Sequence, residues 1–245
     1  MAKTFAEIGQ DKSLPHIGVI MEKRDTQYYP HFELPRGFHF HSYQPGYEEK
    51  WAQLEYEVEG MDTLEEARGV FYTEFLLGQT YQWLDRDGEE KRYPQPEQCP
   101  YFEEMRRRMV FVMDDRGELT GIGALWPGWT FGREDQRLHW IAVKPKYQGL
   151  GIAKAIVSKL LDLYNDMGYS GYLYLASQTW SYKALRIYYL FGFEPYLGEK
   201  PQRWISADFT TDPPQPWDYK QKNEEAWTMI RAKWQEYDEK RSSEC

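Results

Sequence analysis

The most informative segment of the chain runs Ile141-Ala142-Val143-Lys144-Pro145-Lys146-Tyr147-Gln148-Gly149-Leu150-Gly151-Ile152-Ala153. An apolar strand is expected to end at Val143, and two glycines stand where a helix begins. Backbone N–H groups in the first turn of a helix point outward, and the helix dipole favours an anion there. Glycines also allow a pyrophosphate to approach the backbone closely. These residues therefore predict a site for a phosphorylated cofactor.

Two common nucleotide-binding patterns do not fit this segment. The Rossmann pattern G-x-G-x-x-G/A, started at Gly149, needs Gly or Ala at position 154, where the chain has Lys154. The Walker pattern needs Gly-Lys followed by Ser or Thr, which does not occur here. The glycine pair alone is also compatible with a plain turn between strand and helix, so the surrounding residues must decide.

The rest of the chain predicts alternating strands and helices. Hydrophobic periodicity and turn residues indicate strands at 38–43, 109–113, 118–126, 138–143 and 172–177. The same criteria indicate helices at 47–58, 64–77, 152–163 and 181–190, and a loop at 85–100. The order predicts an α/β mixture with one βαβα segment in its second half.

Two motifs carry a resemblance to a known family. Gln148-x-x-Gly151-x-Ala153 resembles the Q/R-x-x-G-x-G/A loop of the GNAT superfamily of N-acetyltransferases. Ala184-x-x-x-Tyr188-x-x-x-Gly192-Phe193 is similar to the other signature of that family, and the two motifs stand in the family's order. The resemblance covers about residues 34–200. It implies a GNAT fold, which is a mixed central sheet of about six to seven strands flanked by about four helices.

Two residues depart from the family pattern. Ser181 stands where the family usually has Asn, which puts one cofactor contact in question. Ser177 replaces the usual aliphatic residue of the preceding strand.

The resemblance implies that acetyl-CoA (coenzyme A) is the co-substrate and that transfer is direct, in a ternary complex. Backbone N–H groups near Ile141 to Val143 would pair with the pantetheine arm and stabilise the oxyanion. The residues expected to bind acetyl-CoA are Ile141, Ala142, Val143, Gln148, Gly149, Leu150, Gly151, Ile152, Ala153, Lys154 and Ser181. No metal site is expected.

Three side chains are candidates for acid–base catalysis. Tyr188 matches the family's usual acid, which protonates the leaving thiolate, although an aromatic-rich helix also suits a packing tyrosine. His139 stands where some aralkylamine-type GNATs carry a histidine base. An imidazole suits that role because it titrates near the working pH. Its alternative role is an ordinary sheet histidine. Glu74 is a further candidate base, although it is one of 39 acidic residues.

Composition limits the partners and the compartment. The formal net charge is -9, which argues against nucleic acid and is compatible with a cationic substrate. The two cysteines, Cys99 and Cys245, form no metal-ligand spacing or disulfide framework. The amino terminus resembles no signal peptide, and the apolar runs are too short to span a membrane. We expect a cytoplasmic protein that binds neither nucleic acid nor membranes, as a monomer or homodimer.

We expect three parts in the chain: an extension at 1–36, the acetyltransferase domain at 37–209, and an extension at 210–245 with one amphipathic helix. One face of this last helix carries Trp227, Ile230, Trp234 and Tyr237. Such an apolar stripe is usually buried, either against its own domain or in a dimer contact.

The predicted function is transfer of an acetyl group from acetyl-CoA to a primary amine, with a small amine or amino-sugar as acceptor. Two alternatives stay open. One is a GNAT-fold module that binds acyl-CoA without transferring it, which the change at Ser181 favours slightly. The other is acetylation of a protein terminus or lysine.

Overall fold

The computed structural model describes residues 10–77, 95–208, 211 and 213–243, and side chains as far as residue 239. Residues 1–9 and most of the loop predicted at 85–100 lie outside this part of the chain. The chain divides into two compact units, which are described separately below. Unit 1 comprises residues 1–30, 126–139 and 164–245, and unit 2 comprises residues 31–125 and 140–163.

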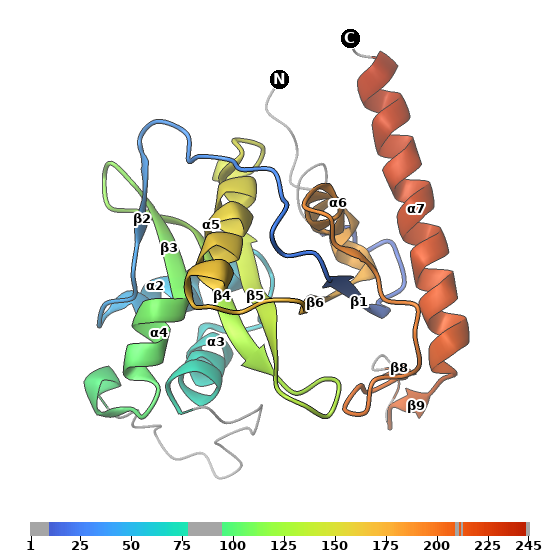
Figure 1. The fold of residues 1–245 in the computed structure, drawn as a ribbon, viewed down its shortest axis with the longest axis horizontal. Coiled ribbons are helices and arrows are strands. Elements are labelled where there is room, and N and C mark those ends of the chain that lie inside the picture. The colour runs from blue at the N-terminus through green and yellow to red at the C-terminus, as the bar shows by residue number, and fades with distance from the viewer. Residues whose placement is uncertain (1–9, 78–94, 209–210, 212, 244–245) are drawn as a thin grey trace. The chain divides into compact units, whose positions relative to one another are not determined.

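Seven strands form one hydrogen-bonded sheet in the order β2-β3-β4-β5-β6-β1-β7 (Figure 1). Their bounds are Gly18–Lys23 (β1), Phe38–His41 (β2), Met109–Asp114 (β3), Leu119–Gly128 (β4), Asp135–Val143 (β5), Leu173–Gln178 (β6) and Glu194–Pro195 (β7). The pairs β2–β3, β3–β4, β1–β6 and β1–β7 are antiparallel, whereas β5–β6 is parallel. The predicted α/β class with a mixed sheet of six to seven strands is confirmed.

Unit 2 contains helices that precede and follow, along the chain, the glycine loop between Val143 and Ile152. They are α2 (Tyr47–Glu57), α3 (Leu64–Val70), the π-helix η1 (Phe71–Leu76), the 3-10 turns η2 (Pro96–Gln98) and η3 (Pro145–Tyr147), α4 (Phe102–Arg108) and most of α5 (Ile152–Asp166). The helix predicted at 64–77 is present as α3 followed directly by η1. The seven-residue α4 was not predicted from the sequence.

Two glycines in β4 allow α5 to approach the sheet. A Cβ atom added at Gly123 would lie 2.6 Å from a methyl carbon of Ile156, and one added at Gly121 would lie 3.0 Å from the same side chain. A Cβ atom at Gly123 would force a shift, and one at Gly121 would be tight, so the two glycines leave room for the helix. The amino-terminal end of α5 is thereby held close to β4.

An aromatic cluster forms the core of unit 2 around α2. The ring of Trp51 lies 5.3 Å from Phe71, 5.8 Å from Phe75 and 5.4 Å from Trp140, measured between ring centroids. Trp51, Phe71 and Phe75 are fully buried. Edge-on and tilted ring pairs at these distances stabilise a core beyond simple area burial.

Unit 1 uses the amino-terminal segment as a sheet strand. Residues 18–23, which the sequence placed in an extension, pair along their whole length with β6, from Gly18 opposite Gln178 to Lys23 opposite Leu173. The other edge of β1 pairs with β7 through Met21 and Glu22. The domain boundaries stay a prediction, but this part of the predicted extension belongs to the sheet.

The remaining elements of unit 1 follow β6. They are η4 (Thr179–Ser181), α6 (Tyr182–Leu190), the short strands β8 (Ala207–Asp208) and β9 (Gln215–Pro216), and α7 (Tyr219–Ser243). Helix α7 packs against α6, β1 and η4. Trp227, Ile230 and Trp234 of its predicted stripe are buried, and the indole N–H of Trp234 donates to the Tyr182 carbonyl at 2.6 Å. These three residues of the stripe are therefore covered within unit 1, whereas Tyr237 is half-buried.

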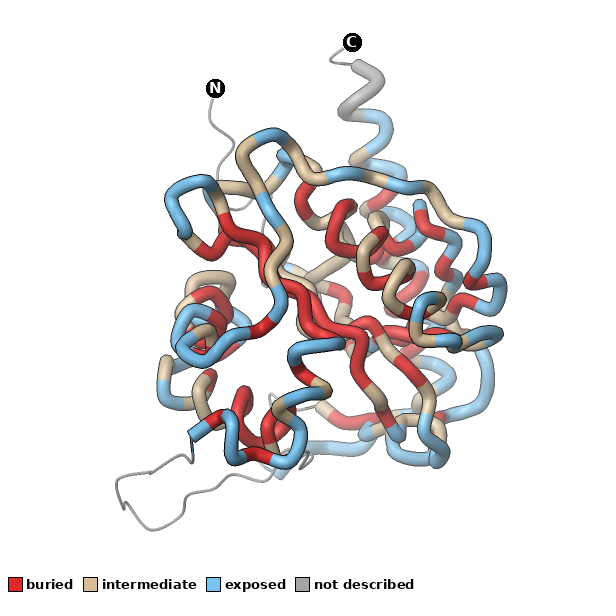
Figure 2. The backbone as a smooth tube through the Cα atoms, turned by 60° about the vertical axis from the view of Figure 1, so that its left-hand side comes forward, coloured by how far each residue is buried: buried red, intermediate tan, exposed pale blue. Residues whose placement is uncertain are grey.

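Burial follows the expected pattern of each element. Burial is concentrated in the centre of the sheet (Figure 2), because β3 and β4 are buried along almost their whole length. No helix in the described residues is both long enough and apolar enough to cross a membrane.

Candidate active site

The loop between β5 and α5 has an open backbone at both of its glycines. Gly149 has φ of +80° and Gly151 has φ of +95°, a left-handed conformation that favours glycine. A Cβ atom added at either position would meet nothing within 4 Å. The free space beside these glycines leaves their backbone accessible to a ligand.

The first turn of α5 adds unpaired backbone donors to this loop. The bond from Ala155 N to Gly151 O begins the helix, so the amides before Ala155 have no helical acceptor. The first turn contains no acidic residue. The backbone and the helix dipole thus favour an anionic group, and they fit the pyrophosphate of a CoA ester.

Ion pairs hold the turn that precedes the glycines. The ammonium of Lys144, which is 8% exposed, lies 3.2 Å from Glu57 Oε1 and 3.4 Å from Glu118 Oε1. Glu118 also accepts from Lys146 at 2.7 Å and from the Tyr147 hydroxyl at 3.1 Å. These basic partners lower the pKa of Glu118. The contacts fasten η3 to the β3–β4 hairpin, so these two lysines stabilise the loop.

Gln148 also fastens the loop. Its side-chain amide N–H donates to the Val143 carbonyl at 2.8 Å, while its buried Oε1 has no hydrogen-bond partner among the described residues. The amide therefore spans the turn from the end of β5 to the first glycine. Its predicted contact with acetyl-CoA stays a prediction.

Lys154 supplies a positive charge in the first turn of α5. Its ammonium lies 5.0 Å from the ring centroid of Phe32, within the range of a cation–π contact. The backbone N–H of Phe32 donates to the Ser158 hydroxyl at 2.9 Å, which ties this segment to α5. The position suits electrostatic attraction of a phosphate.

The middle of β5 departs from regular strand geometry at Trp140. This residue has φ of +46°, which is unusual for a bulky side chain. Its indole N–H donates to Glu74 Oε2 at 2.9 Å, and Glu74 lies buried in η1. Strained backbone that surrounding contacts hold in place is typical of functional sites. Ile141, Ala142 and Val143, the predicted contacts to the pantetheine arm, follow directly.

Tyr188 lies buried in α6 of unit 1. It is 8% exposed, and its ring is 6.2 Å from the ring of Phe193. Its carbonyl accepts from the backbone N–H groups of Phe191 and Phe193, so the Gly192 turn fixes the end of the helix. Burial raises the pKa of the Tyr188 hydroxyl well above its usual value. This phenol therefore keeps its proton at neutral pH.

The other predicted residues of unit 1 are His139 and Ser181. His139 is half-buried in β5. Ser181 precedes α6, and its hydroxyl accepts from the Gln178 side chain at 2.9 Å, so it is engaged within its own unit. Tyr188, His139 and Ser181 belong to unit 1, whereas the loop residues and Glu74 belong to unit 2.

Sequence reasoning missed the role of Trp140. An aromatic residue in an apolar strand gives no sign of a left-handed backbone, and its contact with Glu74 spans 66 residues. Glu74 was named as a candidate base, and the structure adds its hydrogen bond to Trp140. The sequence pointed to Glu74 only as a carboxylate on a predicted helix that has an apolar face.

Residues 77–193 match the model of the acetyltransferase (GNAT) family. No curated protein sequence is similar enough to count as a match.

Among solved structures, the chain is similar to a GCN5-related N-acetyltransferase from Sphaerobacter thermophilus, with 17% identity and a TM-score of 0.50, over 74% of this chain and 50% of that one. A tandem GNAT protein from the clavulanic acid biosynthesis pathway has 13% identity and a TM-score of 0.47, over 77% and 52%. Glucosamine-6-phosphate N-acetyltransferase from Arabidopsis thaliana has 16% identity and a TM-score of 0.34, over 56% and 80%.

The chain spans about half the length of the first two of these structures. Identities this low bear on the fold alone. The match to the Sphaerobacter structure supports the assignment of a GNAT fold. The family model covers both sequence motifs, the glycine loop and the Tyr188 segment. Residues 77–193 therefore form a domain of the acetyltransferase (GNAT) family.

Proposed function

We propose that this protein transfers an acetyl group from acetyl-CoA to the primary amine of a small molecule. The observation that supports this most is the loop of unit 2, where two left-handed glycines with free space beside them lead into α5. GNAT enzymes generally use acetyl-CoA, whose pyrophosphate suits such a loop.

The residues of unit 2 would bind the CoA ester. The amides of Gly149 to Lys154 would donate to the pyrophosphate, and the Lys154 ammonium would add charge attraction. The backbone N–H groups of Ile141 to Val143 would hold the pantetheine arm and the thioester oxygen. The bound ester supplies an activated acetyl group for attack by an unprotonated amine.

The residues of unit 1 would move the protons. Tyr188 would donate its phenol proton to the departing sulfur, since its hydroxyl is protonated at neutral pH. His139 would accept a proton from the amine, directly or through a water molecule. The acceptor we propose is a small amine or amino-sugar, drawn in by the net charge of -9.

The test is substitution of Tyr188. We expect Tyr188→Phe to lower turnover roughly 10- to 1000-fold while the affinity for acetyl-CoA changes little. The next residue offers a matched control, because Tyr189 is 52% exposed on the same helix. Tyr189→Phe should retain turnover. Rates would be followed by release of free thiol over a panel of small amines, amino-sugars and lysine peptides.

The same panel separates the alternatives. Acetyl-CoA binding without thiol release from any acceptor would identify a binding module and exclude the transferase. Thiol release with peptides alone would replace the small-molecule acceptor by a protein. Unchanged turnover in Tyr188→Phe, under conditions where chemistry limits the rate, would remove Tyr188 as the acid.

A further inference from the structure

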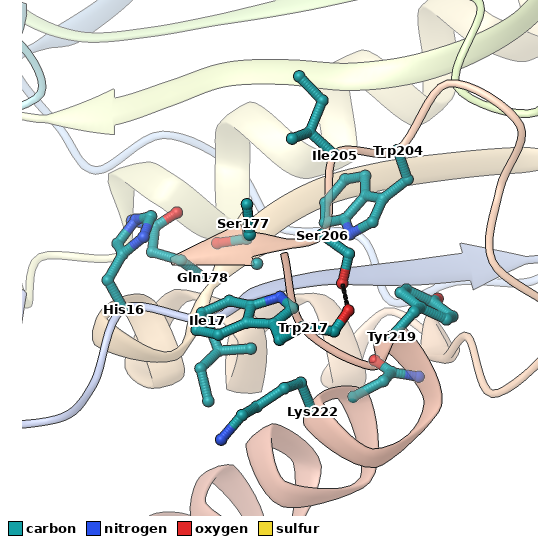
Figure 3. A pocket seen from close by; sticks show the side chains of 13 residues that line it. His16, Ile17, Ser177, Gln178, Trp204, Ile205, Ser206, Trp217, Tyr219 and Lys222 are labelled. Carbon is teal, nitrogen blue, oxygen red and sulfur yellow. Dashed lines mark hydrogen bonds between the residues drawn. The ribbon is translucent and has the colours of Figure 1, made fainter. Parts of the chain in front are cut away.

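Unit 1 contains a cavity of about 350 Å³, and none of the residues named for acetyl transfer lines it (Figure 3). Residues 16–18, the end of β6, residues 204–207 and residues 217–223 line it. Its volume lies in the range of small-molecule pockets. Except for Ser177 and Gln178, the lining falls outside residues 77–193, which match the family model. The cavity is therefore mostly built by segments beyond the family domain.

The walls of the cavity are aromatic. In Figure 3, Trp204 and Tyr219 lie at one end and His16 and Gln178 at the other. Trp204 fits against β1 because residue 18 is glycine, since a Cβ there would lie 2.7 Å from the indole ring. Flat, rigid rings of this kind bind planar aromatic ligands by stacking or edge-on contact.

Trp217 is held in place by the neighbouring strand pair. Its backbone N–H donates to the Ser206 carbonyl at 3.2 Å, and the Ser206 hydroxyl donates back to the Trp217 carbonyl at 3.3 Å. The pairing of β8 with β9 continues this contact. The backbone of Trp217 is thus held in place before any ligand arrives, which lowers the entropic cost of binding.

Asn223 contributes an unpaired acceptor to the lining. It is 5% exposed, and its side-chain N–H donates to the Tyr196 carbonyl at 2.9 Å. That bond fixes which atom is nitrogen, because a carbonyl accepts only from a donor. The other atom, Oδ1, is buried and has no hydrogen-bond partner among the described residues. A buried unpaired acceptor is costly, and a ligand donor would satisfy it.

The charge of the cavity favours a neutral ligand. Among the described residues that line it, Lys222 alone is permanently charged, and its ammonium lies 2.6 Å from Glu225 Oε2. The same ammonium lies over the Trp217 ring at 5.6 Å. Burial lowers the pKa of His16, which keeps that ring neutral at neutral pH. A carboxylate or phosphate group would find little unpaired positive charge here.

Ser177 lines the cavity with a small side chain. It is the strand position at which the family usually has an aliphatic side chain, and Figure 3 shows it beside Gln178. A larger apolar residue would occupy part of the space. The departure from the family pattern and the cavity thus coincide at one residue.

We propose that this cavity binds a neutral, planar aromatic molecule that carries an N–H or O–H donor, with its ring among Trp204, Trp217 and Tyr219 and its donor on Asn223 Oδ1. The site is distinct in its residues from those proposed for acetyl transfer. Its test therefore needs no acetyl-CoA, and its failure would leave the proposed activity untouched.

Indole and benzofuran form a matched pair of probes, because benzofuran replaces the indole N–H by oxygen. We expect calorimetry on the full chain to give a dissociation constant of roughly 1 mM or tighter for indole. Benzofuran should bind at least about tenfold more weakly, since it leaves Asn223 Oδ1 unpaired. Absence of indole binding, or equal affinity for both probes, would overturn the proposal.

Two variants locate the site. Asn223→Leu should remove the preference for indole over benzofuran, whereas Gln221→Leu, at an exposed amide of the same helix, should keep it. Ser177→Leu should weaken indole binding at least about tenfold without lowering the melting temperature. Ser177→Leu stays informative if Asn223→Leu, which loses the bond to Tyr196, fails to fold. Indole affinity unaffected by Ser177→Leu would place the probe elsewhere and contradict the proposal.

Discussion

Glu55 is a carboxyl group enclosed in the core of unit 2. It lies in α2, is 3% exposed, and its Oε1 has no hydrogen-bond partner among the described residues. Burial raises the pKa of Glu55 from 4.5 to about 8. The folded state binds this proton more tightly than the unfolded state. The contribution of Glu55 to the free energy of unfolding is therefore greatest below pH 4.5. It then falls as the pH rises to 8 and changes no further above that.

Replacement of this carboxyl should flatten the pH dependence. In Glu55→Gln the fall of about 1.4 kcal/mol per pH unit between pH 4.5 and 8 should disappear. Urea unfolding at pH 5, 6.5 and 8 measures it. Glu33→Gln, at an exposed position of the same unit, is the control and should leave the slope unchanged. A wild-type slope that persists in Glu55→Gln would assign the effect to another group.

Glu74 and Trp140 form the second residue-scale feature. Their hydrogen bond of 2.9 Å holds a residue with φ of +46° immediately before the amides proposed to bind the thioester. Glu74→Ala should therefore lower kcat/KM about tenfold or more. Glu74→Gln keeps an acceptor for the indole N–H and should stay within about threefold of the unmodified protein.

The glutamine variant separates positioning from catalysis by Glu74. If Glu74 were the general base, the amide could not take a proton, and Glu74→Gln would be as inactive as Glu74→Ala. Steady-state kinetics with acetyl-CoA and a fixed amine distinguish the two results. Equal loss in both variants would contradict the positioning role.

At the scale of elements, the glycine loop and α5 act together. Gly151→Asp would place a carboxylate at the helix end that favours an anion, so acetyl-CoA affinity should fall at least about tenfold, or about 1.4 kcal/mol. Gly171 offers a matched control, since it has φ of +89° and open space around it, like Gly151. Gly171→Asp carries the same backbone strain and should leave the affinity intact. Calorimetry showing equal affinity in both variants would exclude the loop as the pyrophosphate site.

The local elements were predictable because their signals are local. The strand ending at Val143, the two glycines and α5 follow from neighbouring residues, as does the position of Tyr188 on α6. Short α4 has too few turns to show a hydrophobic period. It is held partly by pairs such as Arg108 Nε to Glu104 Oε2 at 2.5 Å. The left-handed Trp140 depends on contacts with η1, which no local pattern reveals.

At the scale of the whole molecule, the termini were the least predictable part. The apolar run in residues 17–21 was visible, but its partner β6 begins about 150 residues later, and no pattern links the two. Likewise the stripe on α7 predicted burial without naming the surface that covers it. Pairings over such distances are settled by the competition among all available surfaces.

Removal of α7 tests how the stripe is used. A chain that ends at Asp218 should have a lower melting temperature, because Trp227, Ile230 and Trp234 are buried within unit 1. Its oligomeric state should match that of the full chain in light scattering. The matched point variants are Ile230→Ala, expected to cost about 2–5 kcal/mol, and the neighbouring exposed Arg231→Ala, expected to cost little. A change from dimer to monomer would instead identify a dimer contact.

The insertion of β1 between β6 and β7 has a consequence for how the chain matures during its synthesis. Met21 leaves the ribosome long before its partner Leu175, which is 154 positions later. At roughly 5–20 residues per second, the delay is about 8–30 s. Throughout that interval the apolar side chains of Ile17, Val19, Ile20 and Met21 lack their native neighbours. The nascent chain therefore exposes an apolar segment near its amino terminus. We expect chaperones that bind exposed apolar peptides to bind this segment.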